Sequence, residues 1–197
     1  MSIKFSKIEI SDAELISEIH YEELGEGIVS LFGLEFINRM YLKLIGAGNW
    51  GFLAKDEGSI IGFIFATKVE VSLQKCLTFS SIIFFFLKIV RNPKKFLVFL
   101  VAFKEFFLLK GKVKIKPTDK TIELSHIAVR TNHKGKGIGE KLIEMLEKKA
   151  KENGFLFIFT RTHNNRLSNY YVRNKNAKLV EIIPLGELNS NILKWKI

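Results

Sequence analysis

One segment dominates the sequence: ELSHIAVRTNHKGKGIGEKLIEMLEKKAKENG, residues 123–154. It opens with an apolar run to Val129 that is rich in β-favouring residues and predicts a strand. From Ile138 to Ala150, apolar residues recur at three- and four-residue steps between charged ones, which predicts an amphipathic helix. Gly154 follows, where a glycine commonly terminates a helix. We therefore expect a strand, a turn and a helix as the framework of the chain.

The turn between this strand and helix is short, basic and rich in glycine. Gly135, Gly137 and Gly139 alternate with other residues, so the backbone can approach a ligand with no Cβ in the way. The first amides of a helix lack internal partners and lie at the positive end of its dipole. Lys134 and Lys136 add full positive charges. The turn therefore predicts a site for a phosphate or pyrophosphate.

Two other glycine-rich phosphate sites fit this sequence poorly. A Walker loop requires G-x-x-x-x-G-K followed by Ser or Thr, and the sequence contains no such string. A Rossmann fingerprint calls for an acidic residue about 20 positions further on. The chain has Thr160, Arg161, Thr162 and His163 there. A glycine turn that only reverses the chain stays open as an alternative.

The run from Val129 to Gly139, with the helix behind it, resembles the acetyl-CoA-binding motif of the GNAT N-acetyltransferases. That motif follows a strand and has the form Q/R-x-x-G-x-G/A, and here Lys134 takes the place of the Gln or Arg. The resemblance is strongest over residues 123–154, and the order of elements extends it over most of the chain. It implies an α/β fold of three layers. The sheet would be mixed and mostly antiparallel, with a splayed central parallel strand pair and flanking helices.

The resemblance also implies acetyl-CoA as the acetyl donor. Backbone groups that are freed where the two parallel strands diverge would hydrogen-bond its pantetheine arm. Ile127 and Val129 would meet that arm, and the turn would hold the pyrophosphate. The cofactor-binding residues expected on this basis are Ile127, Ala128, Val129, Lys134, Gly135, Lys136, Gly137, Ile138, Gly139 and Asn165.

Bulk properties indicate a single domain over residues 1–197, because this length and 47% hydrophobic residues suit one core. The single Cys76 excludes an internal disulfide and fits a reducing cytosol. The first residues lack the apolar stretch of a signal peptide, so we expect a cytoplasmic protein. The four histidines show no metal-ligand spacing, and we expect no metal.

The rest of the chain supports the same order of elements. The Asp56-Glu57-Gly58 string between two apolar runs predicts a hairpin. The apolar run at 155–160 predicts a buried central strand, because both faces of such a strand are covered. We expect strands at 3–10, 50–54, 60–71, 122–129, 155–160, 178–183 and 191–197, and helices at 12–21, 30–45, 138–153 and 164–174.

Residues 72–118 form a basic, Phe-rich insertion before the cofactor strand. They contain ten Lys and Arg against one acid, Glu105, and half of the 18 phenylalanines. A helix is predicted over 77–90, and the spacing of Phe96, Phe99, Phe103 and Phe106 predicts one face of another. The longest uncharged run is 76–87, 12 residues, which is short of the about 20 that span a bilayer.

Three interpretations of this insertion stay open. Its phenylalanines could pack on the first two helices, or on a second copy of the chain in a homodimer. It could contact a membrane surface, with Lys88, Arg91, Lys94 and Lys95 near the headgroups. It could also form a lid over an apolar or phosphate-bearing acceptor.

Acetyl transfer to an amine requires a base that removes the amine proton. Glu123 lies six residues before Val129, where histone-type members of the family carry a glutamate base. Apolar surroundings would raise the pKa of this carboxyl. His126 is the second candidate, since an unperturbed histidine has a pKa of about 6.5.

The reaction also requires an acid that protonates the departing thiolate. The last motif of the family contains a tyrosine, and two registers are open here. Counting from Asn164 places that tyrosine on Tyr171, with Tyr170 beside it. Counting back from Asn176 places Val172 there instead.

We therefore expect an acyltransferase that transfers acetyl directly to a primary amine, in a ternary complex. The expected acceptor is a small molecule that bears a phosphate or is an amino sugar. Acetylation of a protein or peptide stays open, as does a non-catalytic acyl-CoA-binding module. The sequence lacks the aromatic-basic strand or recognition helix of a nucleic-acid-binding protein, so we expect no nucleic-acid partner.

Overall fold

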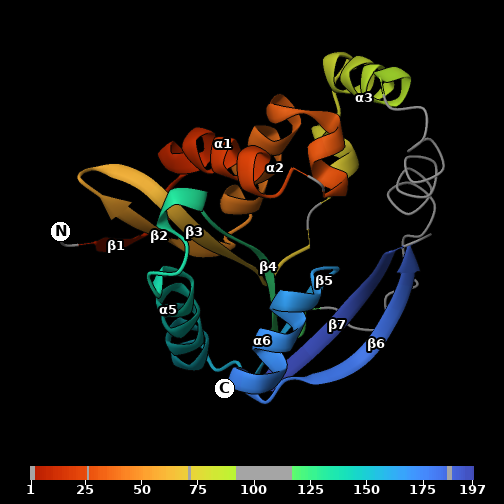
Figure 1. Cartoon of the computed structure of the whole chain (residues 1–197). Helices are drawn as coiled ribbons and strands as arrows, with labels where there is room; N and C mark the ends of the chain where they lie inside the picture. Colours follow the sequence, from red (N-terminus) through yellow and green to blue (C-terminus); the bar gives the residue numbers. More distant parts are fainter. Residues whose placement is uncertain (1–2, 26, 71, 92–116, 186–187) are drawn as a thin grey trace.

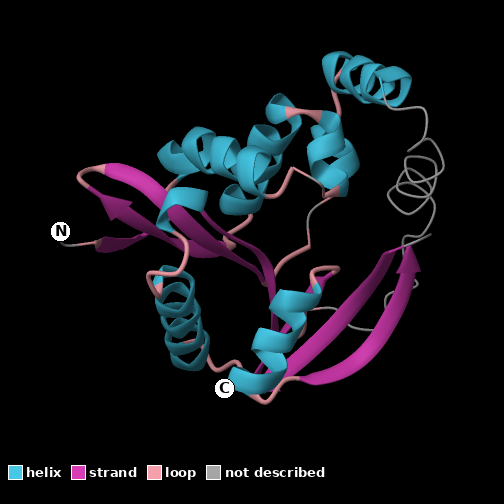
Figure 2. Ribbon diagram, in the orientation of Figure 1, coloured by secondary structure: helices cyan, strands magenta, loops and turns pink. Residues whose placement is uncertain are grey.

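The described residues of the computed structural model form one sheet between two layers of helices (Figures 1 and 2). The sheet has seven strands in the order β1-β2-β3-β4-β5-β7-β6. The strands are β1 Lys4–Lys7, β2 Trp50–Asp56, β3 Ser59–Thr67, β4 Thr121–Val129, β5 Phe157–Thr162, β6 Lys178–Leu185 and β7 Leu188–Lys196. The described residues are 3–25, 27–70, 72–91, 117–185 and 188–197.

The helices lie on both faces of this sheet. Helices α1 and α2 cover one face, and α5 and α6 cover the other (Figure 1). The helices are α1 Ala13–Glu23, α2 Leu34–Gly46, α3 Phe79–Arg91, α5 Ile138–Glu152 and α6 Asn165–Lys175. Short 3-10 helices are η1 Ile10–Asp12, η2 Ile28–Phe32, η3 Leu73–Cys76 and η5 Thr131–His133.

The strand directions confirm the predicted fold class. Strands β4 and β5 run parallel at the centre of the sheet, and every other neighbouring pair is antiparallel. The hairpin between β2 and β3 is also confirmed. Glu57 and Gly58 take the left-handed conformation there, with φ of 49° and 85°, as a tight hairpin turn requires.

Each layer of helices buries its own apolar cluster against the sheet. Phe36 and Tyr41 of α2 are fully buried in the cluster beneath α1 and α2. Leu142 and Leu146 of α5 pack in the second cluster, together with Trp195 of β7. The apolar spacing that predicted the α5 helix is therefore the spacing of its buried face.

Several predicted elements have different bounds in the structure. Strand β3, expected at 60–71, ends at Thr67, and β5, expected at 155–160, is Phe157–Thr162. The helix expected at 30–45 begins only at Leu34, because Gly33 has a φ of 87° and separates η2 from α2. The first strand, expected at 3–10, is limited to Lys4–Lys7, its pairing with β2. The helix predicted within 72–118 is confirmed as α3, whereas the stripe from Phe96 to Phe106 lies outside the described residues.

Candidate active site

The turn after β4 presents its backbone to open space. Gly135 and Gly137 are left-handed, with φ of 80° and 74°, and a Cβ added at either would meet no atom within 4 Å. Gly137 directly precedes Ile138, the first residue of α5. Within the described residues, the backbone amides of residues 135–140 donate no hydrogen bond to a backbone carbonyl. Free amides at the positive end of a helix fit the pyrophosphate of coenzyme A.

One of the two lysines of the turn is held by α1. The Lys134 ammonium lies 2.6 Å from Glu23, whose carboxylate also accepts hydrogen bonds from the amide and hydroxyl of Thr131 at 2.8 and 2.9 Å. Burial would raise the pKa of Glu23, but the bonds from Lys134 and Thr131 outweigh it and lower that pKa. Lys136 is exposed. Lys134 thus positions the turn, and Lys136 is the lysine that extends from it.

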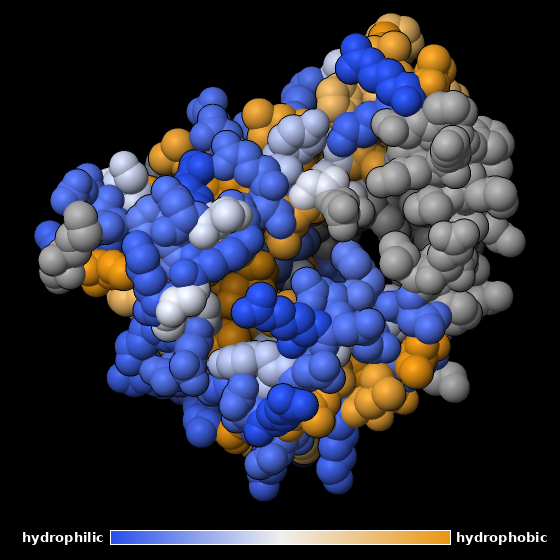
Figure 3. Space-filling view, in the orientation of Figure 1, coloured by the Kyte–Doolittle hydropathy of each residue, from blue (hydrophilic) through white to orange (hydrophobic). Residues whose placement is uncertain are grey.

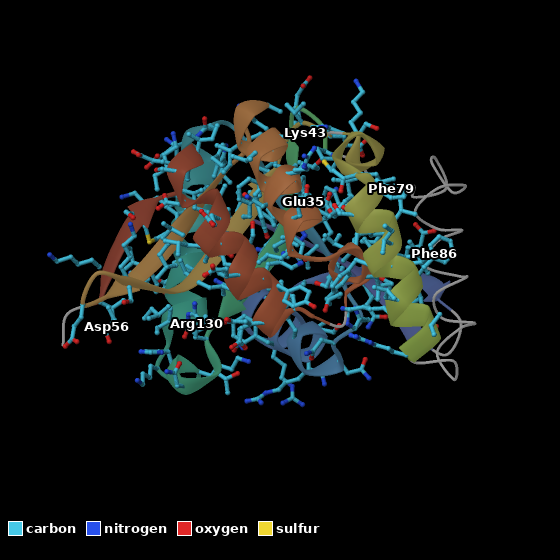
Figure 4. All side chains as sticks on the ribbon, turned by 90° about the horizontal axis from the view of Figure 1, so that it is seen from above. Glu35, Lys43, Asp56, Phe79, Phe86 and Arg130 are labelled. Atoms are coloured by element: carbon cyan, nitrogen blue, oxygen red, sulfur yellow. The ribbon has the colours of Figure 1, made fainter. Side chains whose placement is uncertain are left out.

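Arg130 attaches the end of β4 to two other elements. Its guanidinium donates to Glu22 of α1 and to the Ile60 carbonyl, and its amide donates to the Ile61 carbonyl of β3 at 2.8 Å. Figure 4 shows Arg130 at the edge of the molecule, beside the end of α1. The start of the turn is therefore fixed by α1 and β3 together.

The two parallel strands separate after a short paired region. Their pairing runs from Thr121 opposite Phe157 to Leu124 opposite Thr160. The Thr160 hydroxyl then donates to the Leu124 carbonyl at 2.9 Å. Beyond this point β4 continues beside β3 to Val129, and β5 continues beside β7. The backbone edges of β4 and β5 that face each other across the divergence are available to a ligand.

A β-bulge lies in β4 at the same point. Phe65 of β3 is paired with His126, and the next residue, Ala66, is paired with Leu124. Ser125 is therefore the extra residue, and its hydroxyl bonds to Thr67 of β3. An extra residue reverses the alternation of side chains along a strand.

This bulge sorts the predicted residues onto opposite faces of the sheet. Glu123 lies opposite Thr67 and, like His126, projects to the face that α1 and α2 cover. Ile127 and Val129 pack in the cluster on the other face, with α5 and α6. In the space-filling view, apolar surface is recessed between α5 and α6 (Figure 3). An apolar arm entering between these helices would meet Ile127 and Val129.

Glu123 faces Arg161 across the parallel strand pair. Its carboxylate lies 3.4 Å from the guanidinium of Arg161 on β5, and the arginine side chain is 33% exposed. Burial raises the pKa of Glu123, Arg161 opposes that rise, and Glu70 adds to it. The site thus holds a carboxyl of increased basicity beside a guanidinium that solvent can reach.

His126 belongs to a buried cluster with α1 and α2. The His20 and His126 rings are 4.8 Å apart, and the Tyr41 and His126 rings are 5.6 Å apart. The Tyr41 hydroxyl and His20 Nδ1 share a hydrogen bond of 2.8 Å, whereas His126 Nδ1 is enclosed without a partner. Burial lowers the pKa of His126 to about 4. His126 is therefore neutral at pH 7 and a weaker base than an exposed histidine.

Tyr171 lies in the core between α6 and the sheet. Its ring stacks on Trp195 with centroids 5.1 Å apart, and its hydroxyl is enclosed without a partner. Burial raises the pKa of this phenol, and Tyr170 adds to the rise. Asn176 is left-handed at the end of α6, with a φ of 50°, and Val172 is exposed on the helix. Asn176 thus ends the helix as a glycine commonly does. This agrees with the register counted back from Asn176, in which Val172 takes the position of the family tyrosine.

The remaining residues predicted to bind the cofactor come from α5, β4 and α6. Ile138 is buried at the start of α5, and a Cβ on Gly139 would lie 4.0 Å from Val129, so the helix start adjoins the end of β4. Ala128 projects its side chain into the cluster under α1 and α2, which leaves its backbone for a ligand. Asn165 is exposed as the first residue of α6, and Asn164 caps that helix by accepting from the Leu167 amide.

Known proteins share this sequence pattern and this fold. The sequence profile of the acetyltransferase (GNAT) family matches residues 26–175. The structure resembles the PaiA N-acetyltransferase of Thermoplasma acidophilum in complex with coenzyme A, with 16% identity, 100% of both chains covered and a TM-score of 0.60. It also resembles yncA of Salmonella typhimurium with its cofactor acetyl-CoA, with 12% identity, 100% of this chain and 94% of that chain covered, and a TM-score of 0.60.

A third similar structure is the ribosomal-protein-S18-alanine N-acetyltransferase of Escherichia coli, with 12% identity, 100% and 94% coverage, and a TM-score of 0.61. At such identities these structures show a shared fold. No curated protein sequence matches the chain. The diverging parallel strand pair, with a glycine turn of free amides after β4, fits an acyltransferase of the acetyl-CoA-dependent class. The chain belongs to the GNAT acetyltransferase family, and its acetyl donor is acetyl-CoA.

Proposed function

We propose that this enzyme transfers acetyl directly to the primary amine of a small molecule that also carries an anionic group. The observation that carries the proposal is the pair Glu123–Arg161, which puts a basic carboxylate and a guanidinium side by side on the acceptor face of the diverging strands. A phosphate-bearing amine, such as a phosphorylated amino sugar, supplies both of the groups that this pair would bind.

On the donor side, the glycine turn and the adjoining end of β4 bind acetyl-CoA. The amides from Gly135 to Gly139 hold the pyrophosphate, and exposed Lys136 adds charge. Ile127 and Val129 contact the pantetheine arm on the α5 face. Bound acetyl-CoA supplies the acetyl group as a thioester.

On the acceptor side, Glu123 removes the proton from the attacking amine through a water molecule. Its raised pKa suits this role, because a base works best when its pKa approaches the working pH. His126 is the alternative base on the same face, and the low pKa of its buried ring makes it the weaker candidate. Tyr171 remains the proposed acid, and in that role its enclosed hydroxyl would need to reach the departing sulfur.

Arg161 provides the selectivity for an anionic acceptor. Its Nε lies toward Glu123, and a guanidinium offers further donors that match phosphate or carboxylate oxygens. The lone Cys76 is buried, burial raises the pKa of its thiol, and nearby Lys43 and Arg39 oppose that rise. A buried thiol of low acidity favours direct transfer over an acetyl-cysteine intermediate.

The test is a comparison of acceptors with purified enzyme and acetyl-CoA, with release of the free thiol of coenzyme A as the readout. Phosphorylated amino sugars should give a higher kcat/KM than polyamines of similar size. Arg161→Gln should raise KM for the anionic amines and leave KM for the polyamines unchanged. Faster acetylation of polyamines would overturn the proposed acceptor class.

Acetylation of a protein or peptide is the second candidate, since one similar structure is a ribosomal-protein alanine N-acetyltransferase. Peptides with free N-termini therefore belong in the same assay. Binding of coenzyme A without transfer to any amine would favour an acyl-CoA-binding module. The cytoplasm remains the expected compartment, on the strength of the lone cysteine.

A further inference from the structure

Helix α3 presents its apolar side to the outside of the protein. Phe79 is 80% exposed, Phe86 58% and Val90 74%, and Ile82, Ile83 and Leu87 are exposed on the same helix. The opposite side is buried, with Phe85 stacked on Phe32 at 5.0 Å between ring centroids. A surface helix usually shows the reverse arrangement, with its apolar stripe facing the core. The outer side of α3 therefore has the composition of a binding surface.

Two contacts fix the orientation of this helix. At its start, the Ser80 hydroxyl donates to Glu35 of α2 at 2.6 Å. Near its end, the Lys88 ammonium donates to the Ser30 carbonyl at 3.2 Å and lies 5.1 Å from the centre of the Tyr21 ring. The inner side of α3 is held against the domain along its length, so the apolar residues are directed outward.

The helix also lies at a corner of the molecule (Figure 1). Seen from above, Phe79 and Phe86 point away from α1 and α2 (Figure 4). Apolar surface covers α3 at this corner in the space-filling view, with strongly hydrophilic residues beside it (Figure 3). A flat surface can therefore reach α3 without being blocked by the rest of the described domain.

The charged side chains of α3 itself are all positive. Lys88 and Arg91 lie in its last turn, and α3 contains no acidic residue. In sequence, residues 92–116 continue this bias with seven lysines and one glutamate. Exposed aromatic and aliphatic residues flanked by basic ones are typical of a helix that lies in the interface of an anionic bilayer.

A second copy of the chain fits this helix less well than a lipid surface does. A helix of 13 residues is about 20 Å long and about 10 Å wide, a footprint of about 200 Å². A stable protein interface buries about 800 Å² on each partner. Insertion into headgroups needs no such area, because each apolar side chain transfers into the acyl boundary separately. None of the described helices is both long and apolar enough to cross a bilayer.

We propose that the outer side of α3, formed by Phe79, Ile82, Ile83, Phe86, Leu87 and Val90, binds the surface of a membrane that contains anionic lipids. The helix lies flat in the headgroup region, with Arg91 among the phosphates. This contact holds the enzyme at the membrane and is independent of the acceptor that the active site takes.

The test is co-sedimentation of the full-length protein with phosphatidylcholine vesicles, made with and without phosphatidylglycerol. Wild-type protein should bind the vesicles that contain phosphatidylglycerol, and binding should weaken as salt is raised. The double variant Phe79→Ser/Phe86→Ser should bind at least about tenfold more weakly, because two exposed aromatic side chains no longer enter the acyl boundary. Arg91→Gln should reduce the preference for phosphatidylglycerol.

A matched control is Leu179→Ser/Ile182→Ser, which removes two exposed apolar residues from β6. This variant should bind vesicles like wild type. Equal binding by the α3 variant, or no binding of wild-type protein at low salt, would overturn the proposal. A dimer that the α3 substitutions dissociate, without any vesicle binding, would also overturn it and assign the surface to a second copy. Acetyl transfer in solution should be unchanged in all these variants, so the result does not depend on the proposed acceptor.

Discussion

The ammonium of Lys134 in the glycine turn lies 2.6 Å from the carboxylate of Glu23 at the end of α1. The same carboxylate accepts two hydrogen bonds from Thr131. The turn that we propose binds an anion is thus itself positioned by a carboxylate on a neighbouring helix. This contact joins the proposed donor site to α1, one of the two helices on the proposed acceptor face.

Replacing Glu23 should therefore weaken the binding of coenzyme A. Glu23→Ala removes every contact to Thr131 and Lys134, and we expect a dissociation constant about tenfold higher, measured by calorimetry. Glu23→Gln keeps an acceptor for the Thr131 amide and should have a smaller effect. Glu14→Ala, at an exposed position of the same helix, serves as the control. Equal affinity for wild type and Glu23→Ala would contradict this role of Glu23.

Gly137→Ala tests the backbone of the turn. The left-handed conformation at this residue costs an alanine about 1 kcal/mol or more, although the space around it is open. We expect a loss of unfolding free energy of that size and weaker coenzyme A binding. Gly46→Ala is the matched control, since Gly46 lies in α2 without a left-handed φ and its Cβ would meet nothing within 4 Å. Gly46→Ala should keep wild-type affinity and keep or raise the unfolding free energy, because alanine favours a helix more than glycine does. Similar losses in both variants would argue against a special role of Gly137.

Glu123→Gln tests the proposed base. The variant should keep its affinity for coenzyme A and lose about 10²-fold or more in kcat. In wild type the carboxyl must be ionised to act, and its pKa is raised above the ordinary 4.5. Activity should therefore fall as pH decreases through that raised pKa, and this acid limb should be missing from the residual activity of the variant. An unchanged pH profile would assign the base to another group.

Tyr171→Phe separates the effect of the Tyr171 hydroxyl on stability from its proposed role as the acid. The hydroxyl is enclosed without a hydrogen-bond partner, so its removal should leave the unfolding free energy unchanged or raise it by up to about 1 kcal/mol. If the phenol protonates the thiolate, kcat should fall while coenzyme A binding is kept. A stable variant with full kcat would eliminate Tyr171 as the acid.

His126 should make the fold sensitive to acid. Its pKa is about 4 in the folded protein, against an ordinary 6.5, so between these values the unfolded chain binds more protons than the folded one. Its stabilising effect is therefore complete above about pH 6.5 and declines as pH falls towards about 4. His20, whose pKa is also lowered by burial and by His126, acts in the same direction. Denaturant unfolding at several pH values should show a shallower decline for His126→Gln, by about 1 to 3 kcal/mol across this range. If the unfolding free energies of wild type and His126→Gln changed with pH in parallel, His126 would not be a source of the acid sensitivity.

The local parts of this structure were predictable from sequence. The glycine turn, helix α5 and the β2–β3 hairpin follow from patterns within a few residues, namely alternating glycines, three- and four-residue apolar steps and the Glu57-Gly58 turn. The family resemblance supplied the central parallel pair, which no local pattern specifies.

Local patterns did not predict to which face of the sheet each site residue projects. A strict two-residue period would put Glu123 on the same face as Ile127, and only the bulge at Ser125 separates them. The partners of the site residues are equally distant in sequence. Lys134 bonds to a residue 111 positions away, and no sequence pattern pairs Arg161 with Glu123. Packing decides such contacts, and sequence spacing does not record them.

The bulge in β4 also bears on how such an enzyme can diversify. With one extra residue at Ser125, the same strand directs Glu123 and His126, the proposed bases, to one face of the sheet, and Ile127 and Val129, which we propose contact the donor, to the other. Substitutions that alter acceptor preference can therefore accumulate on one side of the strand while the wall that meets the donor is inherited intact. Members of such a lineage can in this way change the acceptor amine while they keep the binding of acetyl-CoA.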